Sequence, residues 1–75
     1  MIEVRVSYVF AGGWPTMDEA AHNAVGRVSD FSGAGFGERD LGWVCQSEIE
    51  AERISRSLRQ IGMRPAIRRT RAATT

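Results

Sequence analysis

Two capping patterns divide the 75-residue chain into similar halves. In each, a Ser or Thr is followed three residues later by Glu: Thr16 with Glu19, and Ser47 with Glu50. This spacing marks the start of a helix, because the hydroxyl and the carboxylate each accept a hydrogen bond from a backbone N–H that the first turn leaves unpaired. The sequence therefore predicts two helices, one in each half, and any fold for the chain has to accommodate both.

Apolar residues recur at helical spacing after both capping patterns. The first helix is predicted to run through about Ser29, with His22 turned towards solvent. Its apolar side is predicted to consist of Met17, Ala20, Ala21, Ala24 and Val28, with Val25 flanking them. The second helix is predicted to end at Gly62, in the position of a C-cap, and its apolar side to consist of Ala51, Ile54, Leu58 and Ile61.

The segments between the helices have the composition of strands. Residues 2–10 alternate apolar and polar side chains, residues 41–46 (LGWVCQ) are apolar enough for a central strand, and residues 63–70 predict a last strand. Pro65 cannot donate to a strand ladder, so it places this last strand at a sheet edge.

Glycine occupies every second position at Gly33, Gly35 and Gly37. A phosphate loop is disfavoured by two features: the chain has no lysine for the Walker pattern, and no helix directly follows these glycines as a dinucleotide fingerprint requires. We therefore expect residues 31–37 to form a bent strand with bare positions on one face, paired with residues 41–46 around a turn at residues 37–40. A glycine-lined ligand groove and a mobile loop are the alternative interpretations of these glycines.

The resulting order of strand, helix, strand, strand, helix, strand is that of ferredoxin-like folds. We expect a single α/β domain over residues 1–70, a βαββαβ sandwich whose four-stranded antiparallel sheet has two helices on one face, and a frayed basic tail over residues 71–75. The first and third strands are expected at the centre. Residues expected to face the helices are Val4, Val6, Tyr8, Leu41, Trp43, Cys45 and Ile67.

The cysteine content and the hydropathy pattern indicate the compartment. Cys45 is the only cysteine, so no internal disulfide forms, and one thiol with one histidine cannot hold a structural zinc ion. Residues 1–10 lack the pattern of a signal peptide, and no apolar run is long enough to cross a membrane. These features favour a reduced, cytoplasmic setting without membrane association.

Few residues suggest catalysis. His22 is the only histidine, and a contact with Asp18 one turn earlier accounts for it. Cys45 is expected to pack as a small apolar side chain rather than act as a nucleophile. No group of His, Asp or Glu residues has metal-ligand spacing. We therefore expect no catalytic residue, no metal site and no cofactor.

Residues 12–14 form a possible ligand loop, because Gly12, Gly13 and Trp14 lead into a helix N-terminus that offers unpaired amides to an anion. The loop resembles in position the ligand loop of ACT domains, a resemblance that implies small-molecule sensing. Asp18 and Glu19 already occupy the positive end of the helix, which weighs against an anion there.

Charge is distributed unevenly along the chain. Residues 1–52 carry nine acids and three arginines, a net charge of −6, whereas residues 53–75 carry seven arginines and no acid. Such a basic segment suits nucleic acid, an acidic protein surface, or a homodimer in which the basic edge strand meets an acidic surface. Base stacking of the RNA-recognition type is disfavoured because Tyr8 and Trp43 share the inward register, which leaves binding to the nucleic-acid backbone as the alternative.

A protein partner is the preferred hypothesis. Ile49 is predicted on the solvent side of the second helix in line with Arg53, Arg56 and Gln60, and apolar and arginine side chains together are common in protein interfaces. The predicted partner-binding residues are Ile49, Arg53, Arg56, Arg64, Arg68 and Arg69. The sequence thus predicts a non-catalytic binding protein, of the kind found among bacterial or phage accessory and inhibitory proteins, some of which have a ferredoxin-like fold.

Overall fold

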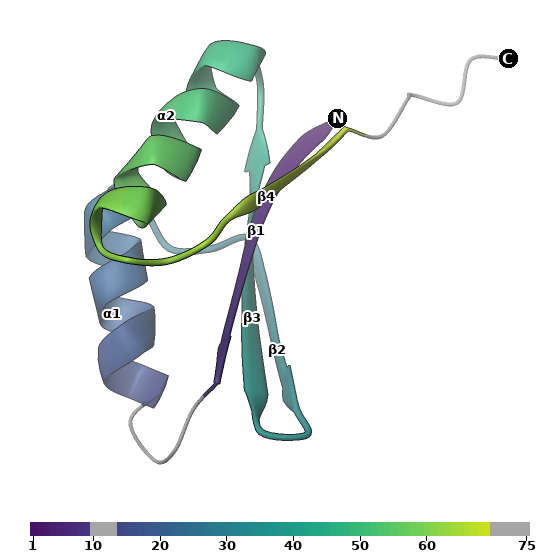
Figure 1. Ribbon diagram of the computed structural model, residues 1–75. Helices are drawn as coiled ribbons and strands as arrows, with labels where there is room; N and C mark the ends of the chain where they lie inside the picture. The colour runs from purple at the N-terminus through teal and green to yellow at the C-terminus, as the bar shows by residue number, and fades with distance from the viewer. Residues whose placement is uncertain (10–13, 70–75) are drawn as a thin grey trace, which may run out of the picture.

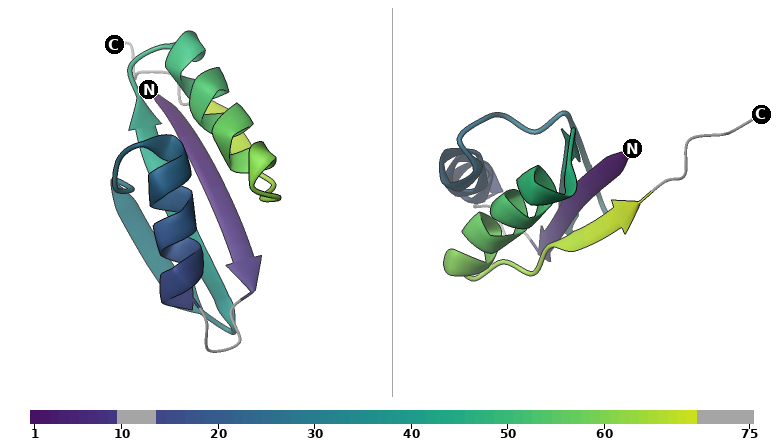
Figure 2. Two further views of the ribbon diagram at one scale, coloured as in Figure 1. Left: turned by 90° about the vertical axis from the view of Figure 1, so that its left-hand side faces the viewer. Right: turned by 90° about the horizontal axis from the view of Figure 1, so that it is seen from above.

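The chain forms a two-layer sandwich of one antiparallel sheet and two helices (Figure 1). The computed structural model describes residues 1–9 and 14–69. Its elements are β1 (Ile2–Val9), α1 (Trp14–Val25), β2 (Phe31–Gly35), β3 (Glu38–Cys45), α2 (Glu48–Gln60) and β4 (Ala66–Arg69). The strand order is β2-β3-β1-β4, and both helices cover the same face of the sheet (Figures 1 and 2). The predicted ferredoxin-like arrangement is therefore confirmed, with the first and third strands at the centre.

The core lies between the helices and the two central strands. In the sheet, Val4 of β1 lies between Trp43 of β3 and Ile67 of β4, so the three side chains share the face that the helices cover. All the residues expected on this face belong to the core or pack against it. The buried hydrophobic residues are Val4, Val6, Ala21, Leu41, Trp43, Cys45, Ala51, Ile54, Leu58 and Met63.

Local sequence accounts well for both ends of α2. Ser47 is the N-cap and its hydroxyl accepts from the Glu50 backbone N–H at 3.1 Å, as predicted. At the other end Gly62 has a φ of +87°, its N–H donates to Arg59 O, and the Met63 N–H donates to Leu58 O. These two bonds form a Schellman motif. Ile61, which the helical spacing places in the core, is instead the C-cap and is exposed.

The bounds of α1 differ from the prediction at both ends. The helix begins at Trp14, so Thr16 lies within the first turn and is not the N-cap. Pro15 suits this early start, because a first-turn residue needs no N–H donor. The helix ends at Val25, since Gly26 adopts a φ of +92° and its N–H donates to the His22 carbonyl at 2.8 Å. Val28, expected on the apolar side of the helix, therefore lies beyond it and is 68% exposed.

The β2–β3 hairpin turns earlier than predicted. Gly35 pairs with Glu38, so the turn consists of Phe36 and Gly37 and not of residues 37–40. Both turn residues have positive φ, +53° and +80°, as a type I′ turn requires. Only Gly33 and Gly35 thus lie within the strand, on the sheet face that the helices leave open, while Gly37 serves the turn.

Phe36 is an unfavourable residue for this turn, because its backbone conformation lowers the stability of the fold. A bulky side chain rarely adopts positive φ, and the Phe36 side chain is fully exposed, so no core packing offsets the strain. Replacing Phe36→Asn, the residue favoured here before glycine, is expected to raise the free energy of unfolding by about 1 kcal/mol. Urea unfolding followed by circular dichroism measures the change. A free energy equal to or below the wild-type value would show that the turn is unstrained.

Close approach across the sheet occurs at a different glycine, Gly42 of β3. A Cβ atom built on Gly42 would lie 2.1 Å from the Phe31 ring, whereas one on Gly33 or Gly35 would meet nothing within 4 Å. Phe31 is the cross-strand partner of Gly42, and its ring covers this bare position in a central strand. The Arg5 guanidinium lies 5.1 Å from the centre of the same ring. The open face of the sheet thus has its own small packed cluster.

Candidate protein-binding surface on the second helix

The arginines fall into two groups. Four form ion pairs: Arg5 with Glu3 (3.2 Å), Arg27 with Asp30 (2.9 Å), Arg39 with Asp18 (2.6 Å) and Arg69 with Glu48 (2.6 Å). The other arginines of residues 1–9 and 14–69 are exposed and have no carboxylate within ion-pair distance in that part of the chain. These are Arg53, Arg56, Arg59, Arg64 and Arg68.

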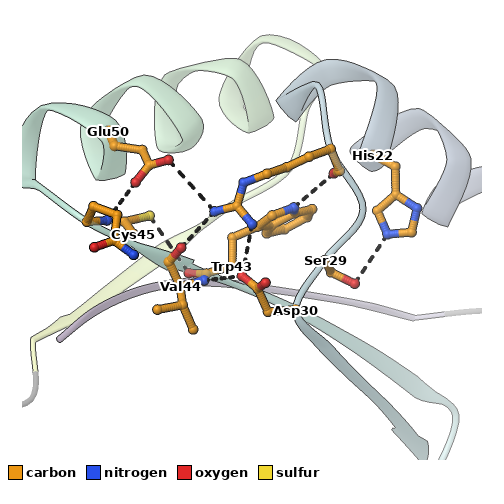
Figure 3. Close-up of polar contacts among 9 residues, drawn as sticks. His22, Ser29, Asp30, Trp43, Val44, Cys45 and Glu50 are labelled. Atoms are coloured by element: carbon orange, nitrogen blue, oxygen red, sulfur yellow. Dashed lines mark hydrogen bonds and ion pairs between the residues drawn. The ribbon is translucent and has the colours of Figure 1, made fainter.

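Arg27 ties the loop after α1 to strand β3 through Asp30 and Val44, which are labelled in Figure 3. Its guanidinium donates to Asp30 and, at 2.7 Å, to the Val44 carbonyl, while its own carbonyl accepts from the Trp43 indole at 3.1 Å. Asp30 in turn accepts from the Val44 backbone N–H at 2.6 Å. The Val44 N–H, with help from Arg27, lowers the pKa of Asp30. Arg27 therefore serves the fold, and its bonds hold β2 beside β3.

Arg39 connects the hairpin to α1. Its guanidinium donates to both Asp18 oxygens, and each of the two side chains is only 17% exposed. The hydrogen bonds to Asp18 raise the pKa of Arg39. Helical spacing predicts a contact between Asp18 and His22. In the structure Asp18 instead accepts from Arg39, 21 positions later in the chain.

The outer surface of α2 is where apolar and unpaired basic side chains meet. Ile49, Arg53, Arg56 and Gln60 are spaced four, three and four residues apart, so they line one side of the helix, which we call the α2 outer surface. Ile49 is 80% exposed and the other three residues are exposed as well. The opposite side of the helix, with Ala51, Ile54, Ser55 and Leu58, is buried. The exposure predicted for Ile49 is confirmed.

The structure separates the six predicted partner-binding residues. Ile49, Arg53 and Arg56 lie together on the α2 outer surface, and Arg64 follows the helix in the connection to β4. Arg68 lies opposite Glu3 in the sheet, on the face away from the helices. Arg69 points to the helix side and is bonded to Glu48 at 2.6 Å. One partner surface can thus contact Ile49, Arg53 and Arg56 together, but it cannot contact Arg68 at the same time.

Cys45 and His22 lie in separate places, Cys45 in the core and His22 between Trp43 and Ser29. Cys45 is 4% exposed, packs in the core, and its thiol contacts the Trp43 carbonyl at 3.8 Å. His22, predicted to face solvent, is half-buried: its ring lies edge-on to Trp43 at 6.1 Å and shares a hydrogen bond with Ser29 (Figure 3). The cause of the difference is the loop after Gly26, which brings Ser29 back beside the helix.

The Cys45 thiol is expected to react slowly in the native protein. Burial raises its pKa, so little reactive thiolate is present near neutral pH, and the core shields the sulfur from reagents. Reaction with a disulfide reagent should be at least about 100-fold faster in urea than in buffer, because it has to await unfolding. Equal rates in the two solutions would contradict the buried position.

The remaining sequence-based site hypotheses have different outcomes. Gly12 and Gly13 of the possible ligand loop lie outside the described residues, and Trp14 begins α1. Over residues 1–9 and 14–69, no three His, Cys, Asp or Glu side chains gather closely enough to hold a metal ion. Within the same residues, no helix combines the length and apolar character needed to cross a membrane.

Two aromatic side chains were not predicted as surface features: Phe31 on the open sheet face and Phe36 in the β2–β3 turn. Tyr8 and Trp43 do face the core, as predicted, but Phe31 puts an aromatic ring on the opposite face beside Arg5. Strand alternation could have predicted the position of Phe31, because Phe31 and Gly33 are two residues apart in β2 and so face the same side of the sheet. The exposed Phe36 had no signal, since a Phe-Gly pair is not a usual turn sequence.

Comparisons of the chain with protein-family models, with curated proteins and with solved structures found no match.

Proposed function

We propose that the protein is a non-catalytic binding protein that attaches to an acidic, partly apolar surface of another protein through the α2 outer surface. The observation that supports this most is the separation of the arginines: Arg53 and Arg56 contribute no ion pair to the described fold, yet they lie one and two turns after the exposed Ile49 on the same side of α2. An exposed apolar side chain in line with arginines is typical of protein interfaces. Binding there would block a surface of the partner, as accessory and inhibitory proteins of bacteria or phages do.

A protein partner suits this surface better than nucleic acid. The exposed apolar side chain of Ile49 lies in line with Arg53 and Arg56, and a phosphate backbone offers no apolar surface to cover it. Arg68, which a backbone-tracking surface would need, lies on the other side of the sheet. Arg68 therefore does not continue the line of Arg53 and Arg56.

Photo-crosslinking tests the proposal. A photoreactive phenylalanine analogue is placed at Ile49 and, as a matched control, at Val28, which is also apolar and exposed but lies in the loop after α1. In extract of the source organism, the probe at 49 is expected to give one discrete protein adduct that survives nuclease. Adding Arg53→Glu and Arg56→Glu should remove it, because charge reversal opposes an acidic surface.

Three results would count against the proposal. These are the absence of any adduct at position 49, equal adducts at positions 49 and 28, and an adduct that the charge reversal leaves unchanged. An adduct that nuclease removes would instead favour binding to the nucleic-acid backbone.

A further inference from the structure

The two edges of the sheet differ in their protection against added strands. Edge strands expose a row of unpaired N–H and C=O groups, and proteins usually protect them with charge, proline or a cover. The β4 edge has Pro65 directly before it and Arg68 and Arg69 within it. The β2 edge, with the sequence FSGAG, has neither charge nor proline. The protein thus protects one edge and leaves the other open.

The outer side of β2 is accessible. Gly35 and Glu38 flank a two-residue turn and so form a hydrogen-bonded pair, and the bonding alternates along antiparallel strands. The backbone groups of Ser32 and Ala34 therefore point away from β3, towards the sheet margin seen in Figure 2. Both residues are exposed, so neither helix covers this edge. On the open face, a Cβ atom added to Gly33 or Gly35 would meet nothing within 4 Å.

We propose that β2 is a self-association edge, which pairs antiparallel with β2 of a second copy around a two-fold axis at Gly33. In this register Ser32 lies opposite Ala34 of the second copy, so the outward backbone groups of both residues bond to one another. Phe31 then lies opposite Gly35 of the second copy, a large side chain beside a bare position. The chain already uses this combination internally, where Phe31 covers Gly42.

Charge favours a second copy at this edge, and the small area limits the strength of the pairing. Two β4 edges would bring Arg68 and Arg69 of both copies together, whereas two β2 edges bring no like charges into opposition. The paired segments are only five residues long, so the interface is below the roughly 1,000 Å² of a stable complex. We therefore expect a weak dimer whose population depends on concentration. This inference does not depend on the function of the α2 outer surface.

Sedimentation equilibrium over a wide concentration range tests the proposal with three variants. Ser32→Lys with Ala34→Lys puts lysines directly opposite each other across the two-fold axis and is expected to give a monomer. Ser32→Lys with Ala34→Glu puts each lysine opposite a glutamate and should restore the dimer. Ala66→Lys, an exposed alanine of the β4 edge, is the matched control and should sediment as the wild type does.

A wild type that stays monomeric at all concentrations would overturn the proposal. So would a double-lysine variant that still dimerises, a lysine–glutamate variant that does not, or an Ala66→Lys variant that becomes monomeric. Amide hydrogen exchange tests the pairing on the wild type alone, so it does not depend on whether a variant folds. Exchange at the Ser32 and Ala34 amides should slow as the protein concentration rises. Exchange that does not depend on concentration would refute the pairing.

Discussion

Trp43→Ala is expected to remove a large part of the free energy of unfolding. Trp43 is the largest fully buried side chain, and its indole also donates to the Arg27 carbonyl at 3.1 Å. Removing a buried tryptophan costs about 3–5 kcal/mol. A 75-residue domain has a total stability of only about 4–11 kcal/mol, so the loss is a large fraction of what holds the fold together.

Circular dichroism and urea unfolding measure this effect. Trp43→Phe keeps most of the apolar contact but loses the indole N–H, and it should retain the fold with a loss of about 1–3 kcal/mol. Val28→Ala is the control, because Val28 is 68% exposed, and it should change the free energy of unfolding by less than about 0.5 kcal/mol. A Trp43→Ala protein as stable as the control would contradict the central position of Trp43 in the core.

Arg39→Met should have the second-largest effect. It leaves the largely buried Asp18 carboxylate without the guanidinium hydrogen bonds that both of its oxygens now accept, at a cost of about 2–4 kcal/mol. The methionine keeps much of the apolar length of the arginine, so the loss reports mainly on the charge pair.

A double-mutant cycle separates the pair from its surroundings. Adding Asp18→Leu to Arg39→Met removes the unpaired charge and should recover about 1–3 kcal/mol of the loss. Urea unfolding of the wild type, the two single variants and the double variant measures the coupling energy, which is the difference between the loss in the double variant and the sum of the two single losses. Additive losses would mean that the two side chains contribute independently, against the contact in the structure.

Sequence patterns predicted the fold where local and tertiary preferences agree. The alternation in β1 and the capping residues of α2 each have one structural solution, and both were correct. The prediction was wrong where a backbone conformation decided the outcome. Gly26 ended α1 early, and Phe36 with Gly37 formed the turn that residues 37–40 were expected to make.

The candidate site was predictable in part for a related reason. Helical spacing alone puts Ile49, Arg53 and Arg56 on one side of α2. Which arginines already have a carboxylate partner depends on contacts between distant residues, such as Arg39 with Asp18 and Arg69 with Glu48. Those contacts follow from the packing of the elements. Strand alternation puts Arg68 and Arg69 on opposite faces of the sheet, but it does not show that Arg69 meets Glu48.

The division between structural arginines and arginines available to a partner is the central claim, and the free energy of unfolding tests it most directly. The comparison is between Arg53→Ala with Arg56→Ala, on the α2 outer surface, and Arg27→Ala, which removes the bonds to Asp30 and Val44. We predict that the double variant unfolds within about 0.5 kcal/mol of the wild type. Arg27→Ala should lose about 1–2 kcal/mol. A double variant that loses as much as Arg27→Ala would show that Arg53 and Arg56 serve the fold, and would contradict the account.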